Sequence, residues 1–215
     1  MADYHLVRNG ETVGLVLPGH ESILPISVDF PVYLRSLKNI NELNSQPLVR
    51  AIGKTARFVV DATAGMGQDS FMLAAAGFEV IGYERSAGIY ALLENGLQRA
   101  MADPVTREMI DDRLQFRHGD AIDELPLLKP QPDAVYLDPM YPPKRRKSAL
   151  SKKEMQVFRE LVGDDDDATR LFETALVTAR ERVVVKRPHH AEPIGGKPSM
   201  SYESKLVRFD VYKVS

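Results

Sequence analysis

From residue 56 onwards, short apolar runs alternate with stretches of helical periodicity, and this alternation limits the fold more than any other feature of the chain. Residues 69–77, 86–100 and 168–179 carry apolar side chains at helical spacing. The apolar runs between and after them predict strands at residues 57–61, 78–84, 114–120, 133–138, 182–186 and 205–214. Strands that alternate with helices predict an α/β fold with a doubly wound, mostly parallel sheet.

The first 55 residues lack this alternation. We expect them to form a small, β-rich N-terminal subdomain (residues 1–55) ahead of a main domain (residues 56–215). Residues 4–17 predict a hairpin around Asn9-Gly10, because an Asn-Gly pair fits the tight turn between two strands. Residues 40–53 predict a short helix that ends at a glycine.

Composition excludes several kinds of site. The chain has no cysteine, which excludes disulfides, thiolate metal ligands and thiol catalysis. It shows neither a long apolar run nor a signal-peptide pattern, so we expect a cytoplasmic protein without membrane attachment. The formal net charge of -2 excludes a uniformly basic nucleic-acid binder but permits a local basic patch. No obvious metal-ligand cluster stands out, and no metal is expected.

The first predicted strand ends in the loop DATAGMGQD, at the edge where such sheets bind ligands. Gly65 and Gly67 permit a sharp turn and a close approach of the backbone to a ligand. Ser70 stands where the dinucleotide fingerprint has its third glycine. Asp61 and Asp69 flank the loop, and their charges would repel a pyrophosphate but suit a cation such as the ammonium of a methionine moiety. The loop therefore favours S-adenosylmethionine over a dinucleotide.

The next two predicted strands also end in acids. Glu84 is suited to accept both hydroxyls of a ribose, a feature shared by dinucleotide and adenosylmethionine binders. Asp120 follows the third strand, and we interpret it as an acceptor for an adenine amino group. An isolated aspartate in this position is also typical of a helix cap.

The fourth strand ends in Asp138-Pro139-Met140-Tyr141, which resembles the D-P-P-Y or N-P-P-Y motif of methyltransferases that act on exocyclic amino groups of bases. The lone pair of such a nitrogen is delocalised into the ring. The Asp138 carboxylate and the rigid Pro139 carbonyl are each suited to accept one of its two N–H groups. Tyr141 offers a ring on which an extruded base can stack. We therefore interpret Asp138, Pro139 and Tyr141 as catalytic residues.

A run of cations follows this motif directly. Residues 144–153 hold six cations and no acid, which next to a base-binding motif predicts contacts with nucleic-acid phosphates. Residues 186–190 close the next strand with two more cations. The predicted RNA-binding residues are Lys144, Arg145, Arg146, Lys147, Lys152, Lys153, Lys186 and Arg187.

Several stretches together resemble the bacterial family that methylates N2 of a guanine in 16S ribosomal RNA. The resemblance covers residues 56–213 and is carried by DATAGMGQD, YER, VYLDPMYP, KSALSKKEMQVFRELVG, RVVVKRP and RFDVY. It implies a class I, Rossmann-like methyltransferase, S-adenosyl-L-methionine as cofactor, and 16S ribosomal RNA or the small ribosomal subunit as partner. The cofactor-binding residues that it implies are Gln68, Asp69, Glu84, Arg85, Asp120, Ala121 and Asp138.

Three other hypotheses stay open from the sequence. The first is a methyltransferase that acts on an amino group of another nucleic-acid base. The second is a dinucleotide-dependent oxidoreductase, which Ser70 and the motif at residues 138–141 disfavour. The third is an RNA-binding protein that has lost catalysis. Thermal-shift comparison of adenosylhomocysteine with NAD separates the methyltransferases from the oxidoreductase.

Overall fold

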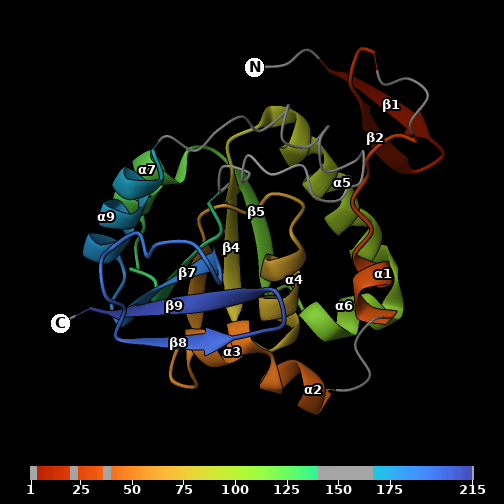
Figure 1. The fold of residues 1–215 in the computed structure, drawn as a ribbon. Helices are drawn as coiled ribbons and strands as arrows, with labels where there is room; N and C mark the ends of the chain where they lie inside the picture. The colour runs from red at the N-terminus through yellow and green to blue at the C-terminus, as the bar shows by residue number, and fades with distance from the viewer. Residues whose placement is uncertain (1–3, 20–23, 36–39, 140–166, 215) are drawn as a thin grey trace.

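A computed structural model describes residues 4–19, 24–35, 40–139 and 167–214. A seven-stranded sheet forms its centre, with helices on both faces and a two-stranded hairpin at one side (Figure 1). The strands of the large sheet are β3 (Phe58–Asp61), β4 (Glu79–Glu84), β5 (Leu114–His118), β6 (Ala134–Leu137), β7 (Arg182–Pro188), β8 (Met200–Glu203) and β9 (Val207–Lys213).

The strand order is β5-β4-β3-β6-β7-β9-β8, and it confirms the doubly wound, mostly parallel sheet. β3 to β7 pair in parallel, whereas β9 is antiparallel to both of its neighbours, β7 and β8. The order reverses between β3 and β6, and open sheets of this kind bind ligands at such a switch point. Strand β8 was not predicted, because residues 200–203 lack a buried apolar run.

The described helices are α1 (Phe30–Arg35), α2 (Ile40–Ser45), α3 (Pro47–Ile52), α4 (Gln68–Ala75), α5 (Ala87–Ala102), α6 (Pro104–Ile110), α7 (Ala121–Glu124) and α9 (Ala168–Thr178), with a 3-10 turn, η1 (Leu125–Leu127), after α7. Ser86 caps α5, as its sequence predicts, by accepting the Ile89 N–H. Helix α6 was missed; Asp103 caps it and Pro104 opens it.

The sheet separates two hydrophobic clusters. Val59 and Tyr136 belong to one, which includes residues of α3, α4 and α5. Val60 and Val135 belong to the other, which includes residues of α7 and α9. Because neighbouring residues of a strand point to opposite faces, two covered faces make each strand a continuous apolar run. This is the pattern from which the strands were predicted.

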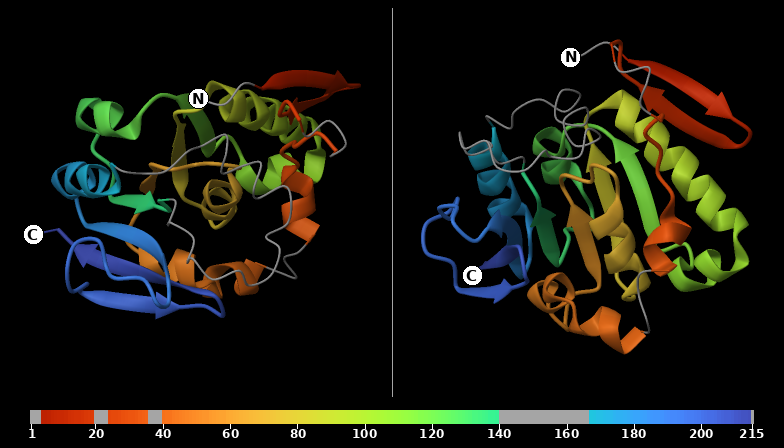
Figure 2. Two further views of the ribbon diagram at one scale, coloured as in Figure 1. Left: turned by 45° about the horizontal axis from the view of Figure 1, so that its top comes forward. Right: turned by 45° about the vertical axis from the view of Figure 1, so that its right-hand side comes forward.

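The N-terminal hairpin is confirmed as β1 (His5–Asn9) and β2 (Thr12–Val16). It lies beside α5 (Figure 2), where Asn95 accepts the Val13 N–H at 2.9 Å. The rest of the N-terminal part is helical and therefore less β-rich than expected. The single helix predicted over residues 40–53 is instead two helices, because Pro47 begins α3 after Gln46.

The N-terminal part shares the core of the main sheet. Leu15, Val28 and Phe30 are buried in the same cluster as Val59 and Phe71. The Phe30 and Phe71 rings stack with their centroids 5.0 Å apart. This packing brings the segment that precedes α1 to the ligand-binding edge of the sheet. Within the described ranges, no helix combines the length and apolar character needed to cross a membrane.

Candidate active site

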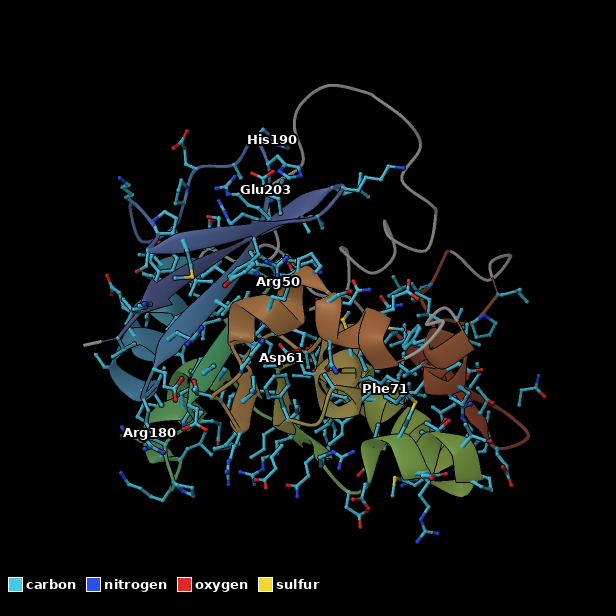
Figure 3. All side chains as sticks on the ribbon, turned by 90° about the horizontal axis from the view of Figure 1, so that it is seen from below. Arg50, Asp61, Phe71, Arg180, His190 and Glu203 are labelled. Carbon is cyan, nitrogen blue, oxygen red and sulfur yellow. The ribbon has the colours of Figure 1, made fainter. Side chains whose placement is uncertain are left out.

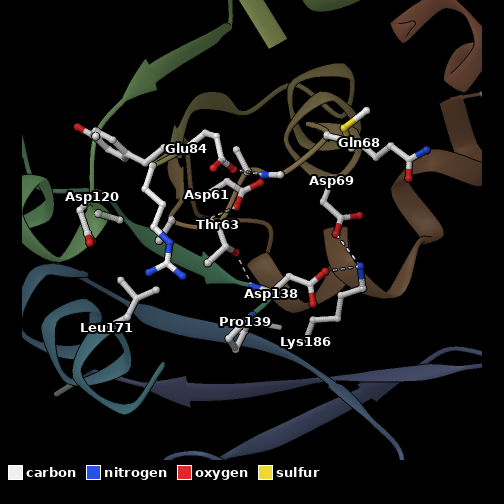
Figure 4. A pocket seen from close by; sticks show the side chains of 18 of the residues that line it. Asp61, Thr63, Gln68, Asp69, Glu84, Asp120, Asp138, Pro139, Leu171 and Lys186 are labelled. Carbon is white, nitrogen blue, oxygen red and sulfur yellow. Dashed lines mark hydrogen bonds and ion pairs between the residues drawn. The ribbon is translucent and has the colours of Figure 1, made fainter. Parts of the chain in front are cut away.

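A pocket of about 830 Å³ opens at the carboxyl ends of the parallel strands (Figure 4). Asp61 ends β3, Glu84 ends β4, Asp120 follows β5 and Asp138 follows β6. Lys186 reaches the same pocket from β7. The structure thus brings together the acids that the sequence placed after successive strands, because parallel strands end at one edge of a sheet.

The pocket carries an excess of negative charge. Among the described lining residues, six carboxylates face two cations; they are Asp61, Asp69, Glu84, Asp120, Asp138 and Asp167, against Arg85 and Lys186. Such a lining repels a pyrophosphate and favours a ligand with cationic groups. S-adenosylmethionine carries both a sulfonium and an ammonium, so this donor set fits it and disfavours a dinucleotide.

Glu84 is fixed at the floor of the pocket by backbone donors. It is only 5% exposed, and its two carboxylate oxygens accept the Ser86 N–H at 2.7 Å and the Gly65 N–H at 3.0 Å. Gly65 adopts a positive φ of 53°, which turns the loop toward Glu84. Each carboxylate oxygen can accept a second hydrogen bond. Glu84 is therefore held in a geometry that suits the ribose hydroxyls of the cofactor.

Asp120 is a helix cap and is also placed where it could accept an adenine amino group, the second role predicted for it. Its Oδ1 accepts the Ile122 N–H at 2.9 Å and so caps α7, while the residue also lines the pocket. Ala121, Ile122 and Leu171 form an apolar wall beside it. An apolar wall with one adjacent carboxylate suits an adenine ring and its amino group.

Arg85 forms an ion pair at the mouth of the pocket. Its Nη1 lies 3.0 Å from Oδ2 of Asp167, the residue before α9, and both side chains are 36% exposed. The pair joins the end of β4 to the start of α9 across the pocket. Asp167 is not among the site residues predicted from the sequence, so its place in the site was missed.

Asp61 is a buried carboxyl in the middle of the molecule (Figure 3). Its Oδ2 accepts the Ser70 hydroxyl at 2.5 Å, and its Oδ1 accepts the Thr63 N–H at 3.1 Å. Burial raises the pKa of Asp61 from 3.8 to about 7; these hydrogen bonds oppose the rise, and the charges of Asp69 and Asp138 add to it. Ser70, which breaks the dinucleotide fingerprint, therefore has a role here as the hydroxyl donor to this acid.

Contacts with Thr63 and Lys186 help to hold Asp138 at the pocket. Its backbone N–H donates to the Thr63 hydroxyl at 2.7 Å, and its Oδ2 lies 2.9 Å from the Lys186 ammonium. The same ammonium lies 2.9 Å from Oδ2 of Asp69, which also accepts the Tyr136 hydroxyl at 2.6 Å. Pro139 follows in the lining of the pocket. Thr63 and Tyr136 are functional neighbours that sequence reasoning did not identify.

The N-terminal segment supplies one wall of the pocket that was not predicted from the sequence. Pro25, Ile26, Ser27 and Tyr33 line the pocket, and Tyr33 forms a hydrogen bond with Gln68. Gln68 points toward α1, away from Glu84 (Figure 4). No motif in residues 24–33 indicates a ligand, so only the packing of this segment on the core reveals its place in the site.

Gly67 is absent from the described lining of the pocket, although its neighbours Met66 and Gln68 belong to it. A Cβ at this position would lie 2.7 Å from Leu93 Cδ2 and 2.9 Å from Phe116 Cζ. Its φ of 74° is also a conformation that side chains disfavour. Gly67 thus serves the turn and the core behind it, whereas Gly65 faces the ligand side.

We therefore expect Gly67→Val to lower stability rather than to block the cofactor. Crowding and backbone strain together should lower the free energy of unfolding by about 2–4 kcal/mol. This loss is measured as a lower melting temperature. Gly77→Val is the matched control, because Gly77 also has a positive φ (99°) but nothing lies within 4 Å of its Cβ position. Normal melting of Gly67→Val with lost affinity for adenosylhomocysteine would restore the original interpretation.

The predicted RNA-binding residues on β7 lie elsewhere than expected. Lys186 points into the pocket, and Arg187 is buried with its guanidinium donating to the Glu192 carbonyl at 2.7 Å and 3.2 Å. Neither is therefore placed as a rim for phosphates. The other predicted positions lie outside the described residues; they are Tyr141, Lys144, Arg145, Arg146, Lys147, Lys152 and Lys153.

In the part of the chain that is described, no group of three acidic or histidine side chains is arranged to hold a metal ion.

The strand order and the acidic pocket at the switch point define a class I S-adenosylmethionine-dependent methyltransferase. The family model described as "Putative SAM-dependent methyltransferase" matches residues 1–214, and the chain belongs to this family. The family membership confirms the enzyme class and the cofactor that the sequence motifs predicted.

Three similar proteins agree with this assignment. Ribosomal RNA small subunit methyltransferase J from Thioalkalivibrio sulfidiphilus is 48% identical over 214 residues, 96% of this chain and 83% of the relative. The protein of the same name from Aeromonas hydrophila is 50% identical over 171 residues, 78% of this chain and 68% of the relative. The crystal structure of a SAM-dependent methyltransferase from Neisseria gonorrhoeae is 36% identical with a TM-score of 0.76, covering 99% of this chain and 83% of that one.

Proposed function

We propose that the protein transfers a methyl group from S-adenosylmethionine to the exocyclic N2 amino group of a guanine in 16S ribosomal RNA. The observation that carries the proposal is the placement of Asp138 and Pro139 in the lining of the cofactor pocket, with the Asp138 carboxylate anchored by Lys186. The names of the relatives support small-subunit ribosomal RNA as the substrate. The motif at residues 138–141 supports an amino group as the acceptor.

The chain's own residues contribute mainly position and charge. The Asp138 carboxylate and the Pro139 carbonyl accept the two N–H groups of the amine and direct its lone pair into the pocket. The acidic lining stabilises the cationic cofactor there. When bound, the cofactor supplies a methyl group: a nitrogen–carbon bond forms, the sulfur–carbon bond breaks, and the sulfur keeps the electron pair. The nitrogen then loses one proton to water at the mouth of the pocket, where the Asp138 side chain is 41% exposed.

The basic residues 144–147 and 152–153 stay a prediction for phosphate contacts. They support the proposal by their place in the chain, directly after the pocket residue Pro139. A cluster of this kind adds sequence-independent affinity, while the pocket selects the base. The proposed partner is 16S ribosomal RNA, naked or in the small subunit, and this substrate supports a location in the cytoplasm.

Mass mapping of methylated nucleosides tests the function directly. Purified protein and tritiated S-adenosylmethionine are incubated with unmodified 16S ribosomal RNA and, separately, with unmodified small subunits. We expect N2-methylguanosine at one position in at least one of the two substrates. Methyl groups on an adenine or cytosine amino nitrogen would establish the alternative base instead. No transfer to either substrate would refute the proposal.

A further inference from the structure

Lys186 occupies a place in the pocket that the predicted role in RNA binding does not explain. Its side chain is 25% exposed, and its ammonium lies between two carboxylates, 2.9 Å from Asp69 and 2.9 Å from Asp138 (Figure 4). We propose that Lys186 is a positioning residue for methyl transfer, which acts by holding the Asp138 carboxylate toward the acceptor amine. This inference rests on the function proposed above and goes beyond it by assigning a residue.

The contacts form a chain from the core to the mouth of the pocket. Tyr136 is fully buried, and its hydroxyl donates to Asp69. Asp69 and Lys186 are 21% and 25% exposed, and Asp138 is 41% exposed. Each link therefore ties a more exposed group to a more buried one. The buried end of this series of contacts, at Tyr136, thereby fixes the Asp138 carboxylate that meets the substrate. Neighbouring residues preorganise a catalytic group in this way.

The ammonium also balances charge. Asp61, Asp69 and Asp138 interact electrostatically across this end of the pocket, and among the described residues Lys186 is a cation that pairs with two of them. Without it, repulsion from Asp69 would favour rotation of Asp138 toward solvent. Burial lowers the pKa of Lys186, but the charges of Asp69 and Asp138 outweigh burial and raise it overall. The side chain thus stays a fixed cation and does not act as a base.

The same surroundings make Lys186 a poor phosphate ligand. An ammonium has three N–H donors, and two of them are directed to carboxylates here. A phosphate brought to the third would face the negative charges of Asp69 and Asp138. RNA contacts through Lys186 are therefore disfavoured, whereas its effect on Asp138 is direct.

The test compares Lys186→Met, which removes the charge and keeps most of the side-chain length, with Lys186→Arg, which keeps the charge. For Lys186→Met we expect the single-turnover rate at saturating cofactor to fall roughly 10- to 100-fold, as a small misplacement of a catalytic group produces. RNA affinity, its salt dependence and the Kd of adenosylhomocysteine should stay near wild type. Lys186→Arg should recover most of the rate. A normal rate, or a loss that follows RNA or cofactor affinity, overturns the proposal.

Two further variants keep the test decisive if Lys186→Met is unstable. Asp69→Asn/Lys186→Met loses one charge of each sign, so it keeps the net charge of the cluster, and it should still be slow. In an Asp138→Asn background, Lys186→Met should change the rate little, because the charged group it holds is already gone. Additive losses in that background would show that Lys186 acts independently of Asp138 and overturn the proposal.

The wild-type protein separates this inference from the proposed function. If wild type transfers no methyl group to 16S ribosomal RNA, the proposed function fails before Lys186 is tested. If wild type is active and Lys186→Met is equally active, only the role of Lys186 fails.

Discussion

Asp138→Ala should lower the single-turnover rate of methyl transfer by on the order of 10²- to 10³-fold, the size of effect seen when one preorganised group at a reacting centre is removed. The substitution leaves the acceptor amine with the Pro139 carbonyl alone and removes one partner of Lys186. RNA affinity should change little, because phosphate contacts supply most of it. Rapid-quench measurements with saturating cofactor and RNA separate the rate from both affinities.

Asp138→Asn is the matched control for this prediction. The amide keeps the shape and one acceptor oxygen but lacks the charge that pairs with Lys186. We expect partial activity, between that of wild type and that of Asp138→Ala, since Asp138 is interpreted as a positioning acceptor rather than a proton sink. If Asp138→Ala transfers methyl groups at the wild-type rate, the assignment of the motif that begins at Asp138 is wrong.

The ligand-binding edge was predictable because each parallel strand is short and ends in a distinct residue. Asp61, Glu84 and Asp138 mark the ends of three apolar runs, and the topology of a doubly wound sheet brings such ends together. The wall formed by residues 25–27 and Tyr33 was not predictable in this way. It depends on how the N-terminal part packs on the core, and nothing in its own sequence shows that contact.

The two cations at the end of β7 show where prediction from adjacency in the sequence fails. Lys186 and Arg187 are neighbours in the sequence, and both are predicted to bind RNA. Side chains of consecutive strand residues point to opposite faces, so the two cannot share a surface. One enters the pocket and the other binds a backbone carbonyl on the far side. Applying this alternation to the end of the strand would have placed the two cations on opposite faces of the sheet.

Gly67 illustrates a different limit. A glycine in this loop predicts close approach of a ligand, yet atoms of Leu93 and Phe116 are what exclude a side chain there. Both explanations predict glycine at this position. Only the packing of α5 and β5 behind the loop distinguishes them, and that packing joins residues far apart in the sequence.

The second prediction with a large expected effect concerns Asp61, because the ionisation of this residue affects both the stability of the fold and the binding of the cofactor. With a pKa raised from 3.8 to about 7, the folded protein holds this proton more tightly than the unfolded chain does. The resulting loss of stability is absent when the pH is below the pKa of Asp61 in the unfolded chain. It grows as the pH rises and is complete above about pH 7. At roughly 1.4 kcal/mol per pH unit, it reaches about 4 kcal/mol.

Asp61→Asn removes the ionisable group and can keep hydrogen bonds with Ser70 and Thr63. The stability gained over wild type should be greater at pH 8 than at pH 5 by about 2–3 kcal/mol, or roughly 5–10 °C in melting temperature. Comparing two pH values cancels the constant difference between burying an amide and burying a carboxyl. Equal gains at both pH values would show that Asp61 does not titrate in this window.

The same substitution should weaken the cofactor site. A cationic ligand favours the ionised form of Asp61, so the affinity of wild type for S-adenosylmethionine should rise as the pH passes 7. Asp61→Asn should bind about tenfold or more weakly at pH 8, a loss of at least about 1.4 kcal/mol, with little pH dependence. Calorimetry across this range measures both effects. A variant that is more stable yet binds as tightly as wild type would mean that the buried charge does not serve the cofactor, and the raised pKa would then lack a role in this pocket.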